Sequence, residues 1–141
     1  IMSQSATRKS NSSLVLTATA PPDGVFQSAK VFEAIRAGLA EEGKELVNRI
    51  KGVFAFKVTG GRDGAEGLWI VDCKTGTGSV EFGGKGKPDV TLTISDVDLL
   101  QLMSGRLNPQ QAFFTGRLKL QGNMGLGMRL KEFQTKFSGK L

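Results

Sequence analysis

The alternation of apolar and polar residues predicts a sheet. Phe54, Phe56 and Val58 alternate with small or polar neighbours, which is typical of a strand that buries one face. The glycine-rich run 60–64 suits a hairpin turn, and the apolar run 68–73 forms the return strand. The same alternation predicts further strands at 79–82, 90–94 and 118–121. The first four strands follow one another directly, so we expect them to form an antiparallel meander.

Apolar residues at helical spacing predict the helices. Residues 26–42 form an amphipathic helix, Gly43 interrupts it, and residues 45–50 form a second, shorter helix. Three more apolar stretches each begin after a residue type that favours helix N-caps, namely Ser95, Asn108 and Asn123. The last of these helices carries Met124, Met128, Leu130, Phe133 and Phe137. The chain therefore predicts an α+β fold, with a five-stranded, mostly antiparallel sheet covered by about five helices.

The chain has room for one domain and a tail. Its 141 residues suit a single hydrophobic core. Residues 1–24 are rich in Ser, Thr and Ala, run into Pro21-Pro22-Asp23-Gly24 and show no sustained period. We expect 1–24 to be a flexible tail or linker and 25–141 to be the folded domain.

Composition restricts the chemistry. The chain has no histidine, which removes the usual general base and the commonest metal ligand. The one cysteine, Cys73, ends an apolar strand and is expected to be a buried small hydrophobe. Asp96 and Asp98 are explained by their place in the first turn of a helix. We therefore expect no catalytic residues, no metal and no cofactor.

Two binding motifs are also weak. The run 83–87 (Gly-Gly-Lys-Gly-Lys) lacks the spacing of a phosphate-binding loop. The aromatic residues Phe54, Phe56, Trp69 and Phe82 belong to apolar faces, whereas nucleic-acid binding requires exposed aromatics among basic residues. Nucleic acid is not an expected partner.

Positive charge gathers at the C-terminal end. The formal net charge is +6, and residues 117–141 alone carry six Lys or Arg against one acid, Glu132. This distribution is typical of a surface that attracts anionic lipids or a phosphate-bearing ligand. It is equally typical of a solvated helix face.

The apolar content of the last third is open to two interpretations. It forms an ordinary core, or it lines a cavity. Met103, Met124 and Met128 are flexible side chains of the kind found at promiscuous apolar surfaces. Gly125 and Gly127 each cost a helix about 1 kcal/mol relative to alanine, which suits a position that a ligand or another backbone approaches closely.

Seven blocks of the chain resemble the sterol carrier protein 2 (nonspecific lipid-transfer) family. They are spread over residues 25–141 and occur in the family's order. The strongest blocks are 102–110 and 112–119 together with 122–124. The others are 31–35, 53–58, 69–72 and 89–95.

The resemblance implies a sheet and helices that enclose an apolar tunnel. It implies noncatalytic binding and transfer of fatty acids, fatty acyl-CoA, phospholipids and sterols by a monomer. The lipid-contacting positions implied here are Phe32, Ile35, Trp69, Leu100, Met103, Phe113, Leu120, Met124 and Met128, with Gln111 as a polar contact for the ligand head. Two alternatives stay open: an interaction or scaffold domain with a filled core, and an acyl-CoA-presenting domain of a larger β-oxidation enzyme.

The resemblance also implies a location. Gly139-Lys140-Leu141 is similar to the peroxisomal tripeptide of a small residue, a base and leucine, although Gly139 departs from the usual Ser or Ala. We expect a peroxisomal import receptor as a partner, transient contact with anionic membranes, and residence in the peroxisome matrix, with the cytoplasm as a second location.

Overall fold

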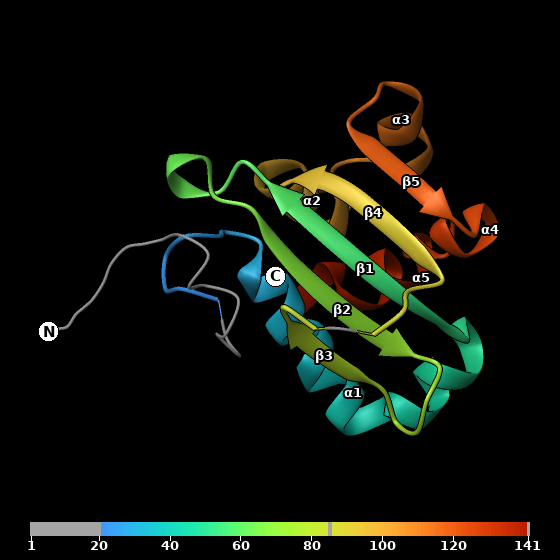
Figure 1. Cartoon of the computed structure of the whole chain (residues 1–141). Coiled ribbons are helices and arrows are strands. Elements are labelled where there is room, and N and C mark those ends of the chain that lie inside the picture. Colours follow the sequence, from blue (N-terminus) through green and yellow to red (C-terminus); the bar gives the residue numbers. More distant parts are fainter. Residues whose placement is uncertain (1–20, 85, 141) are drawn as a thin grey trace, which may run out of the picture.

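The computed structural model describes residues 21–84 and 86–140 (Figure 1). Most of the predicted tail and the terminal Leu141 lie outside the described residues. All five predicted strands are present, each within two residues of its expected bounds. They are β1 (Gly52–Thr59), β2 (Gly67–Cys73), β3 (Ser79–Phe82), β4 (Val90–Ser95) and β5 (Leu118–Gly122).

The strand order corrects the predicted meander. The sheet runs β3-β2-β1-β4-β5, and β1 pairs antiparallel with β2 but parallel with β4. Only β1 to β3 therefore form a meander. The connection after β3 crosses the sheet over Ile70, against which a Cβ on Gly84 would lie at 2.9 Å. This crossing delivers β4 to the far side of β1 and leaves the strongly apolar β1 at the centre.

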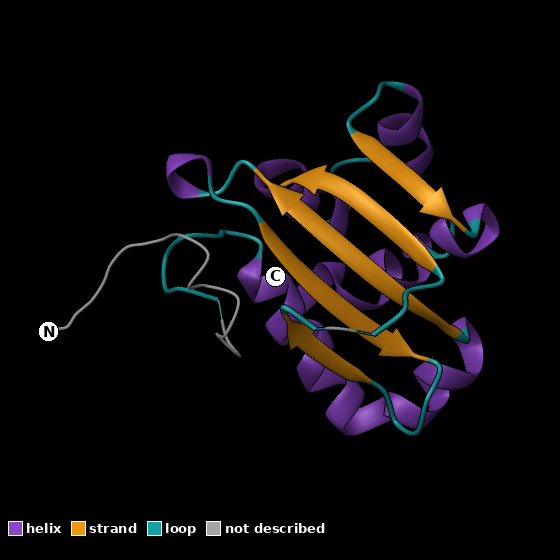
Figure 2. Ribbon diagram, viewed as in Figure 1, coloured by secondary structure: helices purple, strands orange, loops and turns teal. Residues whose placement is uncertain are grey.

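The fold has two layers. Helices α1 (Ala29–Ile50), α2 (Asp96–Met103) and α5 (Leu130–Phe137) lie behind the sheet in the view of Figure 2. The short helices α3 (Pro109–Phe114) and α4 (Met124–Gly127) lie at the two ends of β5, and single 3₁₀ turns occupy Arg62–Gly64 and Ser138–Lys140. The buried strand residues Phe54, Phe56 and Val58 belong with these helices to one hydrophobic core.

The first helix is continuous but kinked. Where two helices were predicted, one helix runs from Ala29 to Ile50, and only Glu42 leaves helical geometry, with φ −132° and ψ 29°. The next residue is Gly43, and a glycine is needed there because a Cβ would lie 2.0 Å from the carbonyl oxygen of Thr77. The β2–β3 turn thus packs directly onto the helix backbone. The Lys136 ammonium group of α5 forms an ion pair with the Glu42 carboxylate, with 2.5 Å between Nζ and Oε2. The kink in α1 is therefore also linked to α5.

The C-terminal helix is divided, although a single helix was predicted. Asn123 does cap it, since its Oδ1 accepts a hydrogen bond from the Leu126 N–H at 3.0 Å. Helix α4 ends at Gly127, and α5 begins at Leu130. Phe133 of α5 packs edge-on against Phe54, with ring centroids 5.3 Å apart. Helix α5 is therefore part of the core.

Candidate functional site

Four of the ten predicted lipid-contacting residues lie in the core. Phe32, Ile35, Trp69 and Met103 are all at most 1% exposed. The rings of Phe32 and Trp69 stack, with centroids 4.4 Å apart and an interplanar angle of 5°. Phe82 packs edge-on against the same indole at 4.9 Å. In this structure the four side chains belong to one filled core, and a ligand that enters it has to separate core side chains.

The other six predicted residues lie on β5, on α2 and α3, and in the segment 124–128 that follows β5. We call them the β5 group. Leu100, Phe113, Leu120 and Met128 are partly buried, whereas Gln111 and Met124 are exposed. Leu120 packs on the core from the sheet edge, and a Cβ on Gly127 would lie 3.0 Å from its side chain. The β5 group is where apolar side chains are accessible without disrupting the core.

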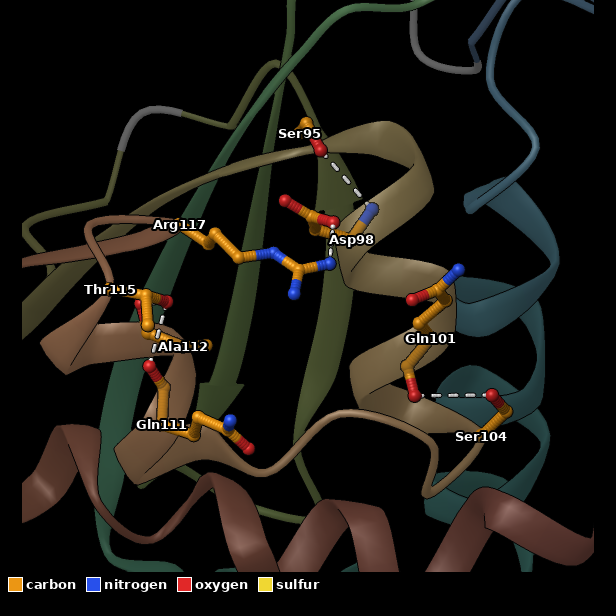
Figure 3. A network of polar contacts seen from close by, with 8 residues as sticks. All are labelled: Ser95, Asp98, Gln101, Ser104, Gln111, Ala112, Thr115 and Arg117. Carbon is orange, nitrogen blue, oxygen red and sulfur yellow. Dashed lines mark hydrogen bonds and ion pairs between the residues drawn. The ribbon is translucent and has the colours of Figure 1, made fainter.

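An ion pair holds α2 to the start of β5 (Figure 3). Arg117 donates a hydrogen bond to the Asp98 carboxylate at 2.7 Å, and the Asp98 N–H donates to Ser95 Oγ at 3.1 Å. The hydrogen bond from Arg117 lowers the pKa of Asp98 most strongly, with burial acting against it and Ser95 adding to it. In the same view Gln111 extends from α3 into the space between α3 and α2. Gln111 and Arg117 are thus polar side chains that lie between α3 and α2.

Hydrogen bonds from α5 hold the connection between α2 and α3 in place. Gln134 donates through Nε2 to the carbonyl oxygens of Leu102, at 2.8 Å, and Leu107, at 3.0 Å. Asn108 then caps α3, accepting from the N–H groups of Gln110 and Gln111 at 2.8 and 3.2 Å. Both the position and the start of α3 are therefore determined by polar contacts.

A hollow of about 250 Å³ lies beside the β5 group. It is lined by Asn108, Pro109, Gln110, Met128 and Lys131. A second hollow, of about 310 Å³, borders Trp69 near the start of α1 and includes Glu33 and Arg36. Both are at or below the lower end of the range of about 300–1,000 Å³ that is usual for small-molecule sites. The predicted apolar tunnel stays a prediction.

The potentially reactive groups have structural roles. Burial, and secondarily the charge of Asp72, raises the pKa of the Cys73 thiol to about 12. Asp96 is buried and accepts hydrogen bonds from the backbone of Gln27 and Ser28. Within the described residues no group of three or more acidic or cysteine side chains could hold a metal ion. Helices with the length and apolar character to span a bilayer are also absent from the described segments.

Two features of this region were not predicted from the sequence. Phe114 is 78% exposed, although it sits in an apolar run that predicts core. Asp96 was expected only to favour its own helix, yet it contacts the start of α1. A helical-wheel projection of 109–114 places Phe113 and Phe114 on adjacent faces, so one of them had to point away. No local signal identifies the partner of Asp96.

Comparison with known proteins identifies the family. Residues 32–135 match the model of the SCP-2 sterol transfer family. The sterol carrier protein 2 of Gallus gallus is 50% identical over 116 residues, which cover 82% of this chain and 21% of the relative. The peroxisomal multifunctional enzyme type 2 of Mus musculus is 43% identical over 119 residues, covering 83% and 16%. The chain belongs to the SCP-2 sterol transfer family and spans about a fifth of these relatives.

Solved structures agree with the fold. The sterol carrier protein domain 2 of Helicoverpa armigera is 40% identical with a TM-score of 0.72, over 88% of this chain and 98% of that one. The palmitated SCP2L2 of Aedes aegypti is 27% identical with a TM-score of 0.61, over 77% and 94%. The predicted α+β fold is thereby confirmed.

Proposed function

We propose that this chain is a noncatalytic lipid carrier, which binds fatty acids, fatty acyl-CoA, phospholipids and sterols and transfers them between membranes. The observation that carries the proposal is the set of accessible apolar side chains in the β5 group, in a member of a sterol transfer family. The palmitated state of the Aedes aegypti relative supports an acyl chain as ligand.

Apolar burial supplies enough free energy for such a ligand. An acyl chain of about 14 methylenes gains about 0.8 kcal/mol for each one buried, or roughly 11 kcal/mol before the costs of association. Contacts with the head group are not needed for micromolar affinity. The carrier therefore accepts several head groups, with Gln111 as their polar contact.

We propose two alternative places for the acyl chain. It lies along the β5 group, or it enters the core by separating Phe32 from Trp69. Trp69 is the single tryptophan of the chain, so its fluorescence reports on the second place. Palmitate that displaces a fluorescent fatty acid and shifts the Trp69 emission lies in the core. Displacement without a shift places it along the β5 group.

Absence of displacement at micromolar palmitate contradicts the carrier function itself. The filled-core alternative then gains support from native mass spectrometry, because a scaffold domain carries no copurified lipid. The substitution Leu120→Ser tests whether palmitate binds along the β5 group. Leu120 is suitable because its side chain is only partly buried. Leu68→Ser, on the other face of the sheet, is the matched control and should bind palmitate like the wild type.

The comparison with the relatives is compatible with a second candidate function. Because the chain spans only about a fifth of them, it also fits an acyl-CoA-presenting domain of a larger β-oxidation enzyme. Palmitoyl-CoA that competes much better than palmitate would favour that role.

We further propose that the chain acts in the peroxisome matrix, since the mouse relative is a peroxisomal enzyme. A monomer is part of the same proposal and follows only from the family resemblance. Gly139-Lys140-Leu141 is the proposed contact for the import receptor, and Leu141 lies outside the described residues. A fluorescent protein that carries residues 130–141 at its C-terminus should enter peroxisomes. The same fusion with Leu141→Ser should stay in the cytoplasm.

A further inference from the structure

Exposed apolar side chains flank β5 at both ends. In the described part of the chain, large apolar residues are exposed at four positions, and two of them lie beside β5. Phe114, at the end of α3, is 78% exposed, and Met124, at the start of α4, is 43% exposed. Phe113 is partly buried and packs beside Phe114, with ring centroids 5.9 Å apart. The Phe114 ring is the most exposed of the four and is therefore free to contact a partner surface.

The same segment is free of acidic residues. Residues 99–131 contain no Asp or Glu but include Arg106, Arg117, Lys119, Arg129 and Lys131. Two of these cations are occupied: Arg117 pairs with Asp98, and Arg129 donates to the carbonyl oxygen of Arg49. Within the described residues no ion pair joins Arg106, Lys119 or Lys131 to an acid, and all three are exposed.

Strand β5 brings these two features together. It is an edge strand, with α3 at one end and α4 at the other (Figure 1). Lys119 lies in the strand between Phe114 and Met124, and Lys131 lines the hollow beside Met128. Helix α1, by contrast, packs on β2 and β3, which lie toward the other edge of the sheet. We call Phe113, Phe114, Met124, Lys119 and Lys131 the β5 edge surface.

We propose that the β5 edge surface docks on anionic lipid bilayers, with Phe114 and Met124 inserted at the level of the head groups and Lys119 and Lys131 against lipid phosphates. The charge complementarity favours this partner, because Lys119 and Lys131 are exposed and no ion pair within the described residues neutralises them, so they attract the head groups of an anionic bilayer. The proposal rests on the proposed carrier function for its purpose: the β5 group is then held at the membrane, where a lipid leaves or enters.

Vesicle cosedimentation tests the surface directly. The full chain should bind phosphatidylcholine vesicles that contain phosphatidylserine, and bind pure phosphatidylcholine vesicles much more weakly. Phe114→Ser should weaken binding to the anionic vesicles about ten-fold, because it removes one inserted aromatic side chain. Lys119→Gln should weaken it about five-fold at low ionic strength, and added salt should reduce that difference.

Two matched variants control for general effects. Leu68→Ser removes an exposed apolar residue from β2, and Lys44→Gln removes an exposed cation from α1. Both should bind anionic vesicles like the wild type. If Lys44→Gln weakens binding as much as Lys119→Gln, net charge rather than this surface drives association, and the proposal is wrong.

Insertion has its own readout. Phe114→Trp should be quenched by brominated lipids in anionic vesicles, whereas Leu68→Trp should not. Absence of quenching at Phe114→Trp overturns the proposal. It is also overturned if the wild type sediments as a dimer that Phe114→Ser dissociates while vesicle binding is unchanged, because the surface then binds a second copy of the chain.

The fatty-acid displacement assay separates this proposal from the carrier function. Phe114→Ser should still bind palmitate in solution while it loses vesicle binding. A wild-type chain that docks through Phe114 but displaces no fatty acid contradicts the carrier function and leaves the docking surface intact. A chain that binds palmitate but docks equally well without Phe114 contradicts the docking surface alone.

Discussion

The carboxylate of Asp96 caps the start of α1 from 68 residues away, accepting a hydrogen bond from the Ser28 N–H at 2.8 Å. Its second oxygen accepts from the Gln27 N–H, also at 2.8 Å. Ser28 occupies the N-cap position of α1, but its side chain makes no capping hydrogen bond. A negative charge at this end also favours the helix dipole. One buried acid therefore serves two helices, α2 as a first-turn residue and α1 as its cap.

Asp96→Asn should destabilise the fold by about 1–3 kcal/mol. The amide keeps one acceptor, so one buried N–H loses its partner and faces an NH₂ group. Urea unfolding followed by circular dichroism measures the change. Asp23→Asn, at an exposed position, is the control and should unfold like the wild type. Equal stability of the two variants would show that the Asp96 contacts contribute nothing.

The pair of Arg117 and Asp98 predicts an effect of pH. Folding lowers the pKa of Asp98, so the pair stabilises the fold above the ordinary carboxyl pKa of about 4, and this contribution disappears as the pH falls through the lowered pKa. Arg117→Gln should therefore raise the pKa of Asp98, as measured by carboxyl NMR. The variant should be less stable than the wild type at neutral pH and equally stable in acid. Arg106→Gln should change neither quantity.

Two glycines should respond to alanine in opposite ways. Gly43→Ala places a Cβ 2.0 Å from the Thr77 carbonyl oxygen, so it should cost roughly 3 kcal/mol through displacement of the β2–β3 turn. Gly125→Ala meets only Asn123 Oδ1, at 3.5 Å, and should be neutral or should stabilise α4 by about 0.5–1 kcal/mol. Thermal unfolding of both variants measures this. A destabilised Gly125→Ala would contradict the open space seen at that position.

Cys73 should be inert in the folded protein. Its thiol has a pKa of about 12 and is buried, so almost no accessible thiolate exists at pH 8. A thiol reagent should react at the rate of unfolding, and urea should accelerate the reaction in parallel with the loss of helical signal. Fast labelling in native buffer would show that β2 opens locally. Because the chain has one cysteine, the label reports on a single position.

Local patterns were sufficient for most of the secondary structure. The alternation around Phe56 predicts β1, and the caps Ser95, Asn108 and Asn123 predict the starts of α2, α3 and α4. These predictions were correct because strand alternation and capping depend on neighbours in the chain. The break between α4 and α5 was missed, because the apolar residues on both sides of it keep one helical period.

The lipid-contacting residues were predicted from the family resemblance, and the ten positions stay a prediction. The structure adds that they lie in two places, a filled core around the Phe32–Trp69 stack and an accessible group along β5. Periodicity alone did not distinguish Phe113 from Phe114. Only the packing of α3 on β5 separates the partly buried ring from the exposed one.

The sequence by itself determined the strands, the caps, the absence of imidazole chemistry and the acid-free segment 99–131, since each is a property of neighbouring residues or of composition. The tertiary structure decided that β4 pairs parallel with β1, that Asp96 caps α1, and that Phe114 faces outward. These relationships join residues far apart in the chain. They depend on how complete elements pack together, and no local preference encodes that packing.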